Sequence, residues 1–255
     1  MEFDELSKED WKLAEPLFAD HQFDTVLIHS VLDGHTGRVL TDSTDSPTAA
    51  RLDTGAFTML GGNPKEDLAL ELIKHSPVFY TTPHNKTWAS RLHHVYAGKI
   101  TKLPFTEYHP DHLKPAHLQE IIHQLPGGYQ LTPLDARLCR QMEMDLDNPC
   151  FFEHFVSIND FLQRGMGYGI VYEGKFVSGA TSMAAARDRI DIEIETKEEF
   201  QQRGLGTVAG AALVLSCINQ GISPQWLSAN RESDRLAERL GLRKGRSYET
   251  FQIDG

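Results

Sequence analysis

The sequence predicts a mixed α/β protein made of two domains. Stretches with the apolar pattern of strands recur between stretches with helical spacing, which is typical of a sheet covered by helices. A helix-breaking cluster, Leu125-Pro126-Gly127-Gly128, divides the chain near its middle. The 255 residues are enough for two domains of ordinary size. We therefore expect an N-terminal α/β domain over 1–125 and a second domain over 126–255.

In the N-terminal domain, strands and helices alternate. We expect helices over 7–19, 65–75, 85–96 and 115–124, and strands over 24–32, 38–41, 49–53, 56–60, 77–81 and 101–108. The strand over 24–32 rests on the apolar character of this segment. The glycine-containing turn over 33–37 predicts a hairpin from this strand onto the next one. Pro64 suits the first turn of the helix that follows it.

The second domain repeats this mixture around one informative strand. We expect strands over 129–131, 167–172, 176–184, 189–196, 224–228 and 249–253, and helices over 135–144, 159–163, 205–220 and 231–240. The strand over 189–196 alternates apolar and charged residues. Its isoleucines face one side, and Asp191, Glu193 and Glu195 face the other.

Composition and charge restrict the partners that we expect. The formal net charge of −11 disfavours nucleic acid and anionic membranes and suits a cationic small molecule. No apolar run reaches the roughly 18 residues of a membrane helix, and the acidic N-terminus does not resemble a secretory signal. Cys139, Cys150 and Cys217 form no CxxC pair, so we expect no disulfide framework and a cytoplasmic location.

The most specific motif is Gln201-Gln202-Arg203-Gly204-Leu205-Gly206, which follows a strand and opens a helix. Its two glycines let a ligand approach the main chain closely. Free N–H groups and the helix dipole at the helix start favour a pyrophosphate, and Arg203 can add a cation. A Walker A loop and a dinucleotide-binding fingerprint both fail, because their further required residues are missing. The alternative that this motif is only a glycine-rich turn from strand to helix, with no ligand, is not excluded.

Two stretches resemble the GCN5-related N-acetyltransferases (GNAT). Ile192–Gly206 resembles the family's acetyl-CoA motif, and Trp226–Asn230 with Leu236–Leu242 resembles its next strand and helix. The resemblance covers about 129–255 and implies a GNAT fold, in which helices flank a mixed, splayed central sheet. The group that the chain most resembles contains the zwittermicin-resistance-type acetyltransferases, which also carry an N-terminal half of this size. We interpret 1–125 as an accessory or acceptor-site domain, or as a diverged GNAT-like layer.

The resemblance implies acetyl-CoA as a co-substrate. By position, main-chain groups of Ile194, Glu195 and Thr196 would contact the acyl carbonyl and pantetheine. The pyrophosphate would be held by the motif and its neighbour, that is by Gln201, Gln202, Arg203, Gly204, Leu205, Gly206 and Thr207. Asn230 and Ser233 would contact the coenzyme. For Asn230 a helix cap on the N–H of Ser233 is an equally good prediction.

The resemblance also implies direct attack of an amine on the thioester, which needs a base and an acid. Glu193 or Glu195 is the candidate base, although an exposed polar strand face would show the same pattern. A bulge in this strand, common in the family, would change which carboxylate faces the cleft. The family's usual acid is a tyrosine, but the matching position is Ala237. Tyr248 or Ser233 could replace it, and Tyr248 is also readily explained as a packed aromatic.

The histidines of the N-terminal half do not show the spacing of metal ligands, so we expect no metal. The predicted function is an N-acetyltransferase acting on a primary amine of a small molecule. Two alternatives stay open: a non-catalytic acyl-CoA-binding or sensing module, and a protein or peptide N-acetyltransferase. A homodimer is also left open.

Overall fold

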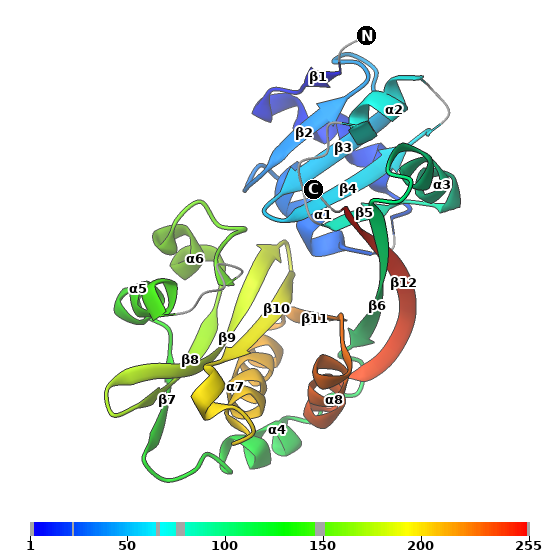
Figure 1. Cartoon of the computed structure of the whole chain (residues 1–255). Helices are drawn as coiled ribbons and strands as arrows, with labels where there is room; N and C mark the ends of the chain where they lie inside the picture. The colour runs from blue at the N-terminus through cyan, green and yellow to red at the C-terminus, as the bar shows by residue number, and fades with distance from the viewer. Residues whose placement is uncertain (1–2, 22, 65–66, 75–79, 146–150, 254–255) are drawn as a thin grey trace. The chain divides into compact units, whose positions relative to one another are not determined.

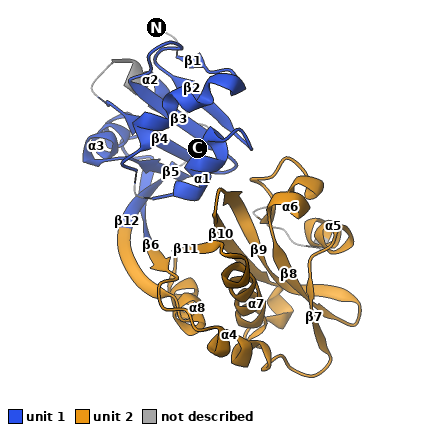
Figure 2. Cartoon of the chain, turned by 180° about the vertical axis from the view of Figure 1, so that it is seen from behind, with its two compact units in different colours: residues 1–105, 248–255 blue, residues 106–247 orange. Residues whose placement is uncertain are grey.

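The computed structural model describes residues 3–21, 23–64, 67–74, 80–145 and 151–253. These residues form two compact units, unit 1 from 1–105 with 248–255 and unit 2 from 106–247 (Figure 2). Strands β6 (Ile100–His109) and β12 (Arg243–Ile253) contribute residues to both units. Strands and helices mix in each unit, so the predicted α/β class is confirmed.

Unit 1 is built on strands in the order β1-β2-β3-β4-β5-β12 (Figure 1). Its elements in chain order are β1 (Asp4–Glu5), the 3-10 helix η1 (Lys8–Phe18), α1 (Thr25–Leu32), β2 (Arg38–Thr41), β3 (Ala49–Thr54), β4 (Phe57–Gly62), α2 (Asp67–Lys74), β5 (Tyr80–Pro83) and α3 (Lys86–Val95). The paired neighbours run antiparallel except β4 and β5, which run parallel.

The segment 24–32, which was expected to be a strand, forms helix α1 instead. The buried apolar residues of this helix are Val26, Leu27, Ile28, Val31 and Leu32. A short segment with only five apolar residues among nine is too brief to show a clear strand or helix period, so its pattern cannot separate the two. Strand β2 pairs with β1 and β3, and the predicted hairpin onto 38–41 is therefore wrong.

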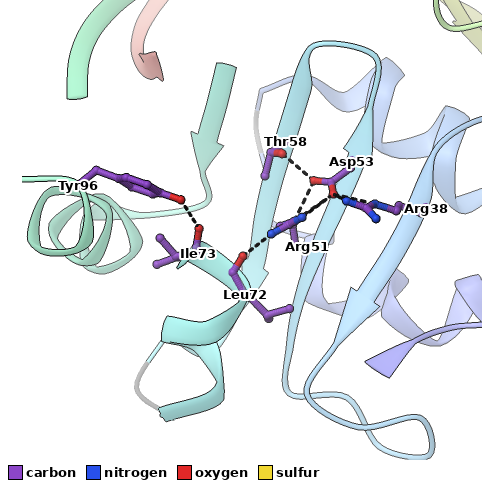
Figure 3. Close-up of polar contacts among 7 residues, drawn as sticks. All are labelled: Arg38, Arg51, Asp53, Thr58, Leu72, Ile73 and Tyr96. Carbon is purple, nitrogen blue, oxygen red and sulfur yellow. Dashed lines mark hydrogen bonds and ion pairs between the residues drawn. The ribbon is translucent and has the colours of Figure 1, made fainter. Parts of the chain in front are cut away.

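A fully compensated ion pair lies inside unit 1 on strand β3. Arg51 is completely buried and donates from Nε and Nη2 to the Asp53 carboxylate, at 2.7 to 3.1 Å. Its Nη1 donates to Leu72 O at 2.6 Å. Arg38 Nε at 3.0 Å and the Thr58 hydroxyl at 2.6 Å also donate to Asp53 (Figure 3). Buried charges are tolerated when they are paired and hydrogen-bonded in this way.

Unit 2 is built on strands in the order β6-β11-β10-β9-β8-β7. Its other elements in chain order are α4 (Pro115–Ile122), β7 (Tyr129–Pro133), α5 (Ala136–Asp145), α6 (Ile158–Arg164), β8 (Gly167–Tyr172), β9 (Lys175–Ala186), β10 (Arg189–Thr196), the 3-10 helix η3 (Glu198–Phe200), α7 (Leu205–Gln220), β11 (Ser223–Ser228) and α8 (Arg231–Leu240). Only β10 and β11 pair in parallel among the described neighbours. Helix α7 is buried along most of its length and contacts β8, β9 and β10.

The division into units differs from the boundary expected at 125/126. Helix α4 belongs with unit 2, because Leu118 and Ile121 share a hydrophobic core with the residues of α7. The last residues, from Tyr248, belong with unit 1. The helix-breaking cluster at 125–128 therefore marks the turn between α4 and β7. The functional roles assigned to the two domains stay predictions.

Strand β12 begins at Arg243, earlier than the strand expected over 249–253, because its charged first residues hide the strand pattern. Cys139 and Cys217 are buried free thiols. Cys150, the helix start expected at 65–66 and the strand residues 77–79 lie outside the described residues. Within the described ranges, no helix has both the length and the apolar character needed to cross a membrane.

Candidate active site

Strands β10 and β11 separate partway along their length, and this opening is the main feature of unit 2 (Figure 1). The two strands pair only where 189–191 of β10 faces 223–225 of β11. From Trp226 onward β11 pairs with β6, while β10 continues from Ile192 to Thr196 beside β9. In the part of the chain that the structure describes, this edge of β10 has no second strand partner. It therefore offers main-chain groups to a ligand.

The hydrogen bonds to β9 show which main-chain groups face the opening. Lys197 N donates to Val177 O at 3.0 Å, and the Ser178 hydroxyl donates to Glu195 O at 3.2 Å. Along an antiparallel pair, residues that bond the neighbouring strand alternate with residues that turn away from it. The main-chain groups of Ile194 and Thr196 therefore face the opening, whereas those of Glu195 face β9.

Helix α7 starts at the loop that the glycine motif predicts. Gln202 and Gly204 have left-handed backbones, with φ of 60° and 78°. Among the described residues no side-chain hydrogen bond caps the start of α7, and a Cβ added to Gly204 would meet no described atom within 4 Å apart from its chain neighbours. The loop therefore presents uncapped N–H groups and the positive end of the helix dipole. These are the features of an anion-binding helix start.

The Arg203 side chain is held within the loop by its neighbours. Nη1 donates to the Tyr129 hydroxyl at 2.9 Å, and Nη2 donates to Glu199 O at 2.8 Å. The guanidinium also lies over the Phe200 ring, 5.1 Å from its centroid. These contacts shape the loop. A direct contact from Arg203 to a phosphate stays a prediction.

Two glycines let α7 lie close against β10. A Cβ added to Gly206 would lie 3.2 Å from Ile194 Cγ2 and Thr196 Oγ1, and one added to Gly210 would lie 2.7 Å from Ile194 Cδ1. A larger residue at either position would push the helix away from the strand. Gln201 also ties the loop to the strand, because its Nε2 donates to Thr196 O at 3.2 Å. The helix start and the open strand edge thus lie next to each other.

Carboxylates gather on the opposite face of β10. Because Ile194 faces α7, alternation along the strand places Glu193 and Glu195 on the other face. Burial raises the pKa of the Glu193 carboxyl to about 7, with further contributions from the charges of Glu195 and Glu153. A main-chain hydrogen bond from Ile194 lowers this pKa in part. A carboxyl group with such a pKa can accept a proton from an ammonium ion near neutral pH.

The only change of register between β9 and β10 lies on β9. Asp191 pairs with Ala184, but the next residue, Ile192, pairs with Ser182, so Met183 is the extra residue. A bulge on β9 leaves the alternation along β10 unbroken. Glu193 and Glu195 therefore stay on one face, as the sequence predicts.

Sequence reasoning missed Glu153 and His154. The two side chains lie 3.3 Å apart, between Glu153 Oε1 and His154 Nε2, and His154 is completely buried. The Thr181 hydroxyl on β9 donates to Phe151 O at 3.4 Å, which helps to hold this segment on the sheet. The segment lies between α5 and α6, and no periodic pattern or spacing connects it with β10. Only the folded chain brings Glu153 close to Glu193.

The side chains of Asn230 and Ser233 form hydrogen bonds at the start of α8. Asn230 Oδ1 accepts from Glu232 N at 3.0 Å and from Ser233 N at 2.9 Å, so the predicted helix cap is confirmed. Ser233 Oγ accepts from Trp226 Nε1 at 3.0 Å. Both residues thus position the strand and helix beside the opening. Their contact with a coenzyme stays a prediction.

The candidate acid Tyr248 and the carboxylates of β10 belong to different units. Tyr248 belongs to unit 1, where its hydroxyl donates to Asp24 Oδ1 at 2.9 Å and its ring stacks on Phe23 at 3.9 Å. These are the contacts of a packed aromatic residue. Ala237, at the position of the family's tyrosine, is completely buried in α8. The role of Tyr248 as an acid stays a prediction.

Several histidines take part in packing. The His93 ring meets Phe251 edge-on at 5.1 Å, and His117 Nε2 hydrogen-bonds Arg239 O at 2.9 Å. A Cβ on Gly245 would collide with the His109 ring. Across the described ranges, no group of three or more His, Cys, Asp or Glu side chains could hold a metal ion.

A parallel strand pair that splays beside an uncapped, glycine-rich helix start defines an acyltransferase of the GCN5-related class. The chain belongs to the GNAT acetyltransferase family, which matches residues 15–251. It is 23% identical over 259 residues to a Bacillus subtilis (strain 168) protein, the "uncharacterized N-acetyltransferase YdfB", with 97% of each chain covered. The protein is therefore a transferase, and the match extends over both units.

Solved structures agree with this assignment. A GCN5-related N-acetyltransferase-like protein from Streptococcus suis 89/1591 is 26% identical, with a TM-score of 0.84, and the match covers 96% of this chain and 98% of that chain. A tandem GNAT protein from the clavulanic acid biosynthesis pathway is 12% identical, with a TM-score of 0.62 and coverage of 100% and 98%. The second likeness shows the fold alone. The predicted GNAT fold is confirmed.

Proposed function

We propose that this protein transfers the acetyl group of acetyl-CoA directly to a primary amine of a small molecule. The observation that carries the proposal is the arrangement around β10. The open strand edge and the uncapped start of α7 lie side by side, and the same strand carries Glu193, whose pKa is raised to about 7. A coenzyme site and a proton acceptor are thus combined on one strand.

The residues of the opening fit the coenzyme. The outward main-chain groups of Ile194 and Thr196 would hydrogen-bond the pantetheine amides, as an added strand would. The N–H groups from Gln202 to Thr207 would hold the pyrophosphate. When bound, acetyl-CoA supplies an acetyl thioester whose carbonyl carbon accepts the amine.

The chain's own residues supply the proton transfer and the charge stabilisation. Glu193 takes a proton from the ammonium group, directly or through water, and so frees the nitrogen lone pair for attack. A main-chain N–H on the open edge of β10 stabilises the negative charge that develops on the acyl oxygen. As the new C–N bond forms, the C–S bond breaks, and coenzyme A leaves as a thiolate that takes up a proton. Glu195 and Glu153 keep Glu193 basic, and their charges attract a cationic acceptor. We place this reaction in the cytoplasm, where the thiols of Cys139 and Cys217 stay reduced.

One observation favours a second candidate, a module that binds acyl-CoA without transferring the acyl group. Ala237 stands where many GNAT enzymes carry the tyrosine acid. A coenzyme A release assay over cationic, neutral and anionic amines separates the two functions. We expect amine-dependent release of free thiol by the wild-type chain. Tight binding of acetyl-CoA without release for any amine, protein N-termini included, would favour the binding module.

A further inference from the structure

Unit 1 contains a buried aspartate, Asp24, in a strained backbone conformation. Asp24 is 4% exposed and stands at the start of α1, with φ of 54° and ψ of 28°. Residues other than glycine rarely adopt this left-handed conformation, and such strain concentrates at binding sites. The carboxylate accepts a hydrogen bond from the Tyr248 hydroxyl at 2.9 Å. Its Oδ2 is buried and, apart from the influence of the Thr82 hydroxyl on the carboxyl, has no hydrogen-bond partner among the described residues.

The charge of Asp24 is uncompensated, in contrast to that of Asp53 in the same unit. Asp53 accepts hydrogen bonds from two guanidinium groups (Figure 3). Asp24 forms no ion pair with any residue that the structure describes. Burial raises the pKa of the Asp24 carboxyl, and the hydroxyls of Thr82 and Tyr248 offset this only in part. A bound cation would remove the cost of burying the ionised carboxylate.

Two neighbouring histidines add hydrogen-bond acceptors and no positive charge. His21 Nδ1 lies 2.8 Å from Phe23 O, so this nitrogen carries the proton and donates it. Burial lowers the pKa of His21 to about 4, which leaves Nε2 as an acceptor at neutral pH. The His84 ring lies 5.4 Å from that of His21. His21 Nε2 and His84 Nδ1 are both buried without a hydrogen-bond partner in the described residues.

Thr82 on β5 joins the histidines to the aspartate. Its main chain is near enough to His21 to affect the pKa of that ring, and its hydroxyl is near enough to Asp24 to affect the pKa of that carboxyl. The same hydroxyl hydrogen-bonds that of Thr250 on β12 at 3.0 Å. The polar atoms without partners are therefore gathered at one place on the sheet.

A row of aromatic rings in mutual contact begins beside Asp24. Tyr248 stacks on Phe23 at 3.9 Å and lies 5.9 Å from Phe105, which meets Tyr80 at 6.3 Å. Phe23 and Tyr80 are partly exposed, whereas Phe105 and Tyr248 are buried. Ring faces attract organic cations and pack against apolar groups. The row thus connects the buried carboxylate with rings that solvent reaches.

We infer that unit 1 binds an organic ammonium ion, with its positive group at Asp24 and its apolar body on the row Phe23, Tyr248, Phe105 and Tyr80. The surrounding acceptors disfavour an anion. A neutral alcohol could donate a hydrogen bond but would leave the carboxylate charge uncompensated. The site lies wholly in unit 1 and needs no coenzyme, so it can be tested separately from acetyl transfer.

Calorimetry on the full chain without coenzyme tests this inference with three probes of one shape: phenethylamine, 2-phenylethanol and phenylacetate. We expect the amine to bind at least tenfold more tightly than the alcohol, and phenylacetate to show no binding. Asp24→Asn keeps the hydrogen bond from Tyr248 and tolerates the left-handed backbone. It should weaken amine binding at least tenfold, while Tm stays the same or rises because an uncompensated buried charge is lost.

Asp33→Asn is the matched control, because it removes the same charge at the other end of α1. It should leave the affinity for the amine unchanged. Equal affinity of the wild-type chain for the amine and the alcohol would overturn the inference, even if Asp24→Asn failed to fold. So would unchanged amine binding in Asp24→Asn, or the lack of saturable binding by any probe up to about 10 mM, a range that covers even weak sites.

Discussion

Glu193 is partly buried on the face of β10 that it shares with Glu195, and desolvation together with the charge of Glu195 raises the pKa of the Glu193 carboxyl to about 7. The charge of Glu153 adds to this effect. Below that pKa the carboxyl group holds its proton and cannot accept another. Above it, the carboxylate is ionised and is a stronger base than an ordinary glutamate. The pH dependence of the reaction should therefore follow this group.

Glu193→Gln should lower kcat/KM about 10²-fold at pH 7, because the amide cannot accept the proton of the ammonium group. The deficit should shrink as pH rises, since more of the acceptor is then already a free amine. Initial rates from pH 6 to pH 10 measure this change, with coenzyme affinity by calorimetry as the control. Equal rates for the variant and the wild-type protein at every pH would rule out Glu193 as the base.

Glu195→Gln should shift the acidic limb of the kcat/KM profile to lower pH. Removing the neighbouring negative charge lowers the pKa of Glu193 toward the ordinary value of 4.5, so the base is ionised over a wider range. Glu153→Gln should act in the same direction and less strongly, because its charge is the smaller cause. An acidic limb that does not move in either variant would mean that it reports another group.

Gly204→Asp should weaken coenzyme binding at least tenfold. The substitution places a carboxylate at the uncapped start of α7, where a pyrophosphate would approach, and each charge-assisted hydrogen bond lost there is worth about 1.5–3 kcal/mol. Gly204→Asn is the matched control, since it has the same shape and the same left-handed strain without the charge. Calorimetry should find the asparagine variant clearly closer to wild type. Equal losses in both variants would point to strain instead of charge.

Arg51→Met should destabilise the protein by about 3–5 kcal/mol, because it leaves the buried Asp53 carboxylate with one guanidinium instead of two. Lys102→Met is the control, since the pair of Lys102 with Glu249 is half-exposed and worth about 0–1 kcal/mol. Unfolding by urea measures both free energies. A loss for Arg51→Met no larger than for the control would show that Arg38 alone compensates the charge.

The parts of the site that could be predicted carry local signals. The alternation of β10, the glycines at the start of α7 and the asparagine cap of α8 each follow from neighbouring residues in the chain. The parts that were missed depend on contacts between distant segments. Glu153 reaches Glu193 through a loop without any motif, and nothing in its own sequence distinguishes it from a solvated residue.

Two features of the fold were also missed because they depend on contacts between distant segments. The segment 24–32 is too short for its apolar residues to show a clear period, and its contacts with η1, β2 and β3 form only in the folded chain, where it is helix α1. The unit boundary was placed at a visible helix breaker, whereas the structure divides the chain inside two long strands, β6 and β12. A division within strands leaves no proline or glycine cluster to mark it. The position of Tyr248 in unit 1 follows from that division.

The remaining prediction concerns the charge of the acceptor. Glu193 and Glu195 share one face of β10, Glu153 lies close by, and the whole chain carries a formal net charge of −11. Such a field raises the local concentration of cations and disfavours anions. We therefore expect polyamine-like or aminoglycoside-like amines to be better acceptors than anionic amino acids of similar size.

Salt should reveal whether this preference is electrostatic. For a cationic acceptor, kcat/KM should fall several-fold as ionic strength rises from about 0.01 to 0.15 M, because the Debye length shortens from about 30 to 8 Å. A zwitterionic acceptor, in which a carboxylate offsets the charge of the ammonium group, is the control. Its kcat/KM should depend less on ionic strength. Glu195→Gln should reduce the salt dependence for the cation, since it removes one of the charges beside Glu193. A screen in which glutamate-like amines are the best acceptors, or in which salt affects all acceptors equally, would show that the shape of the site and not its charge selects the substrate.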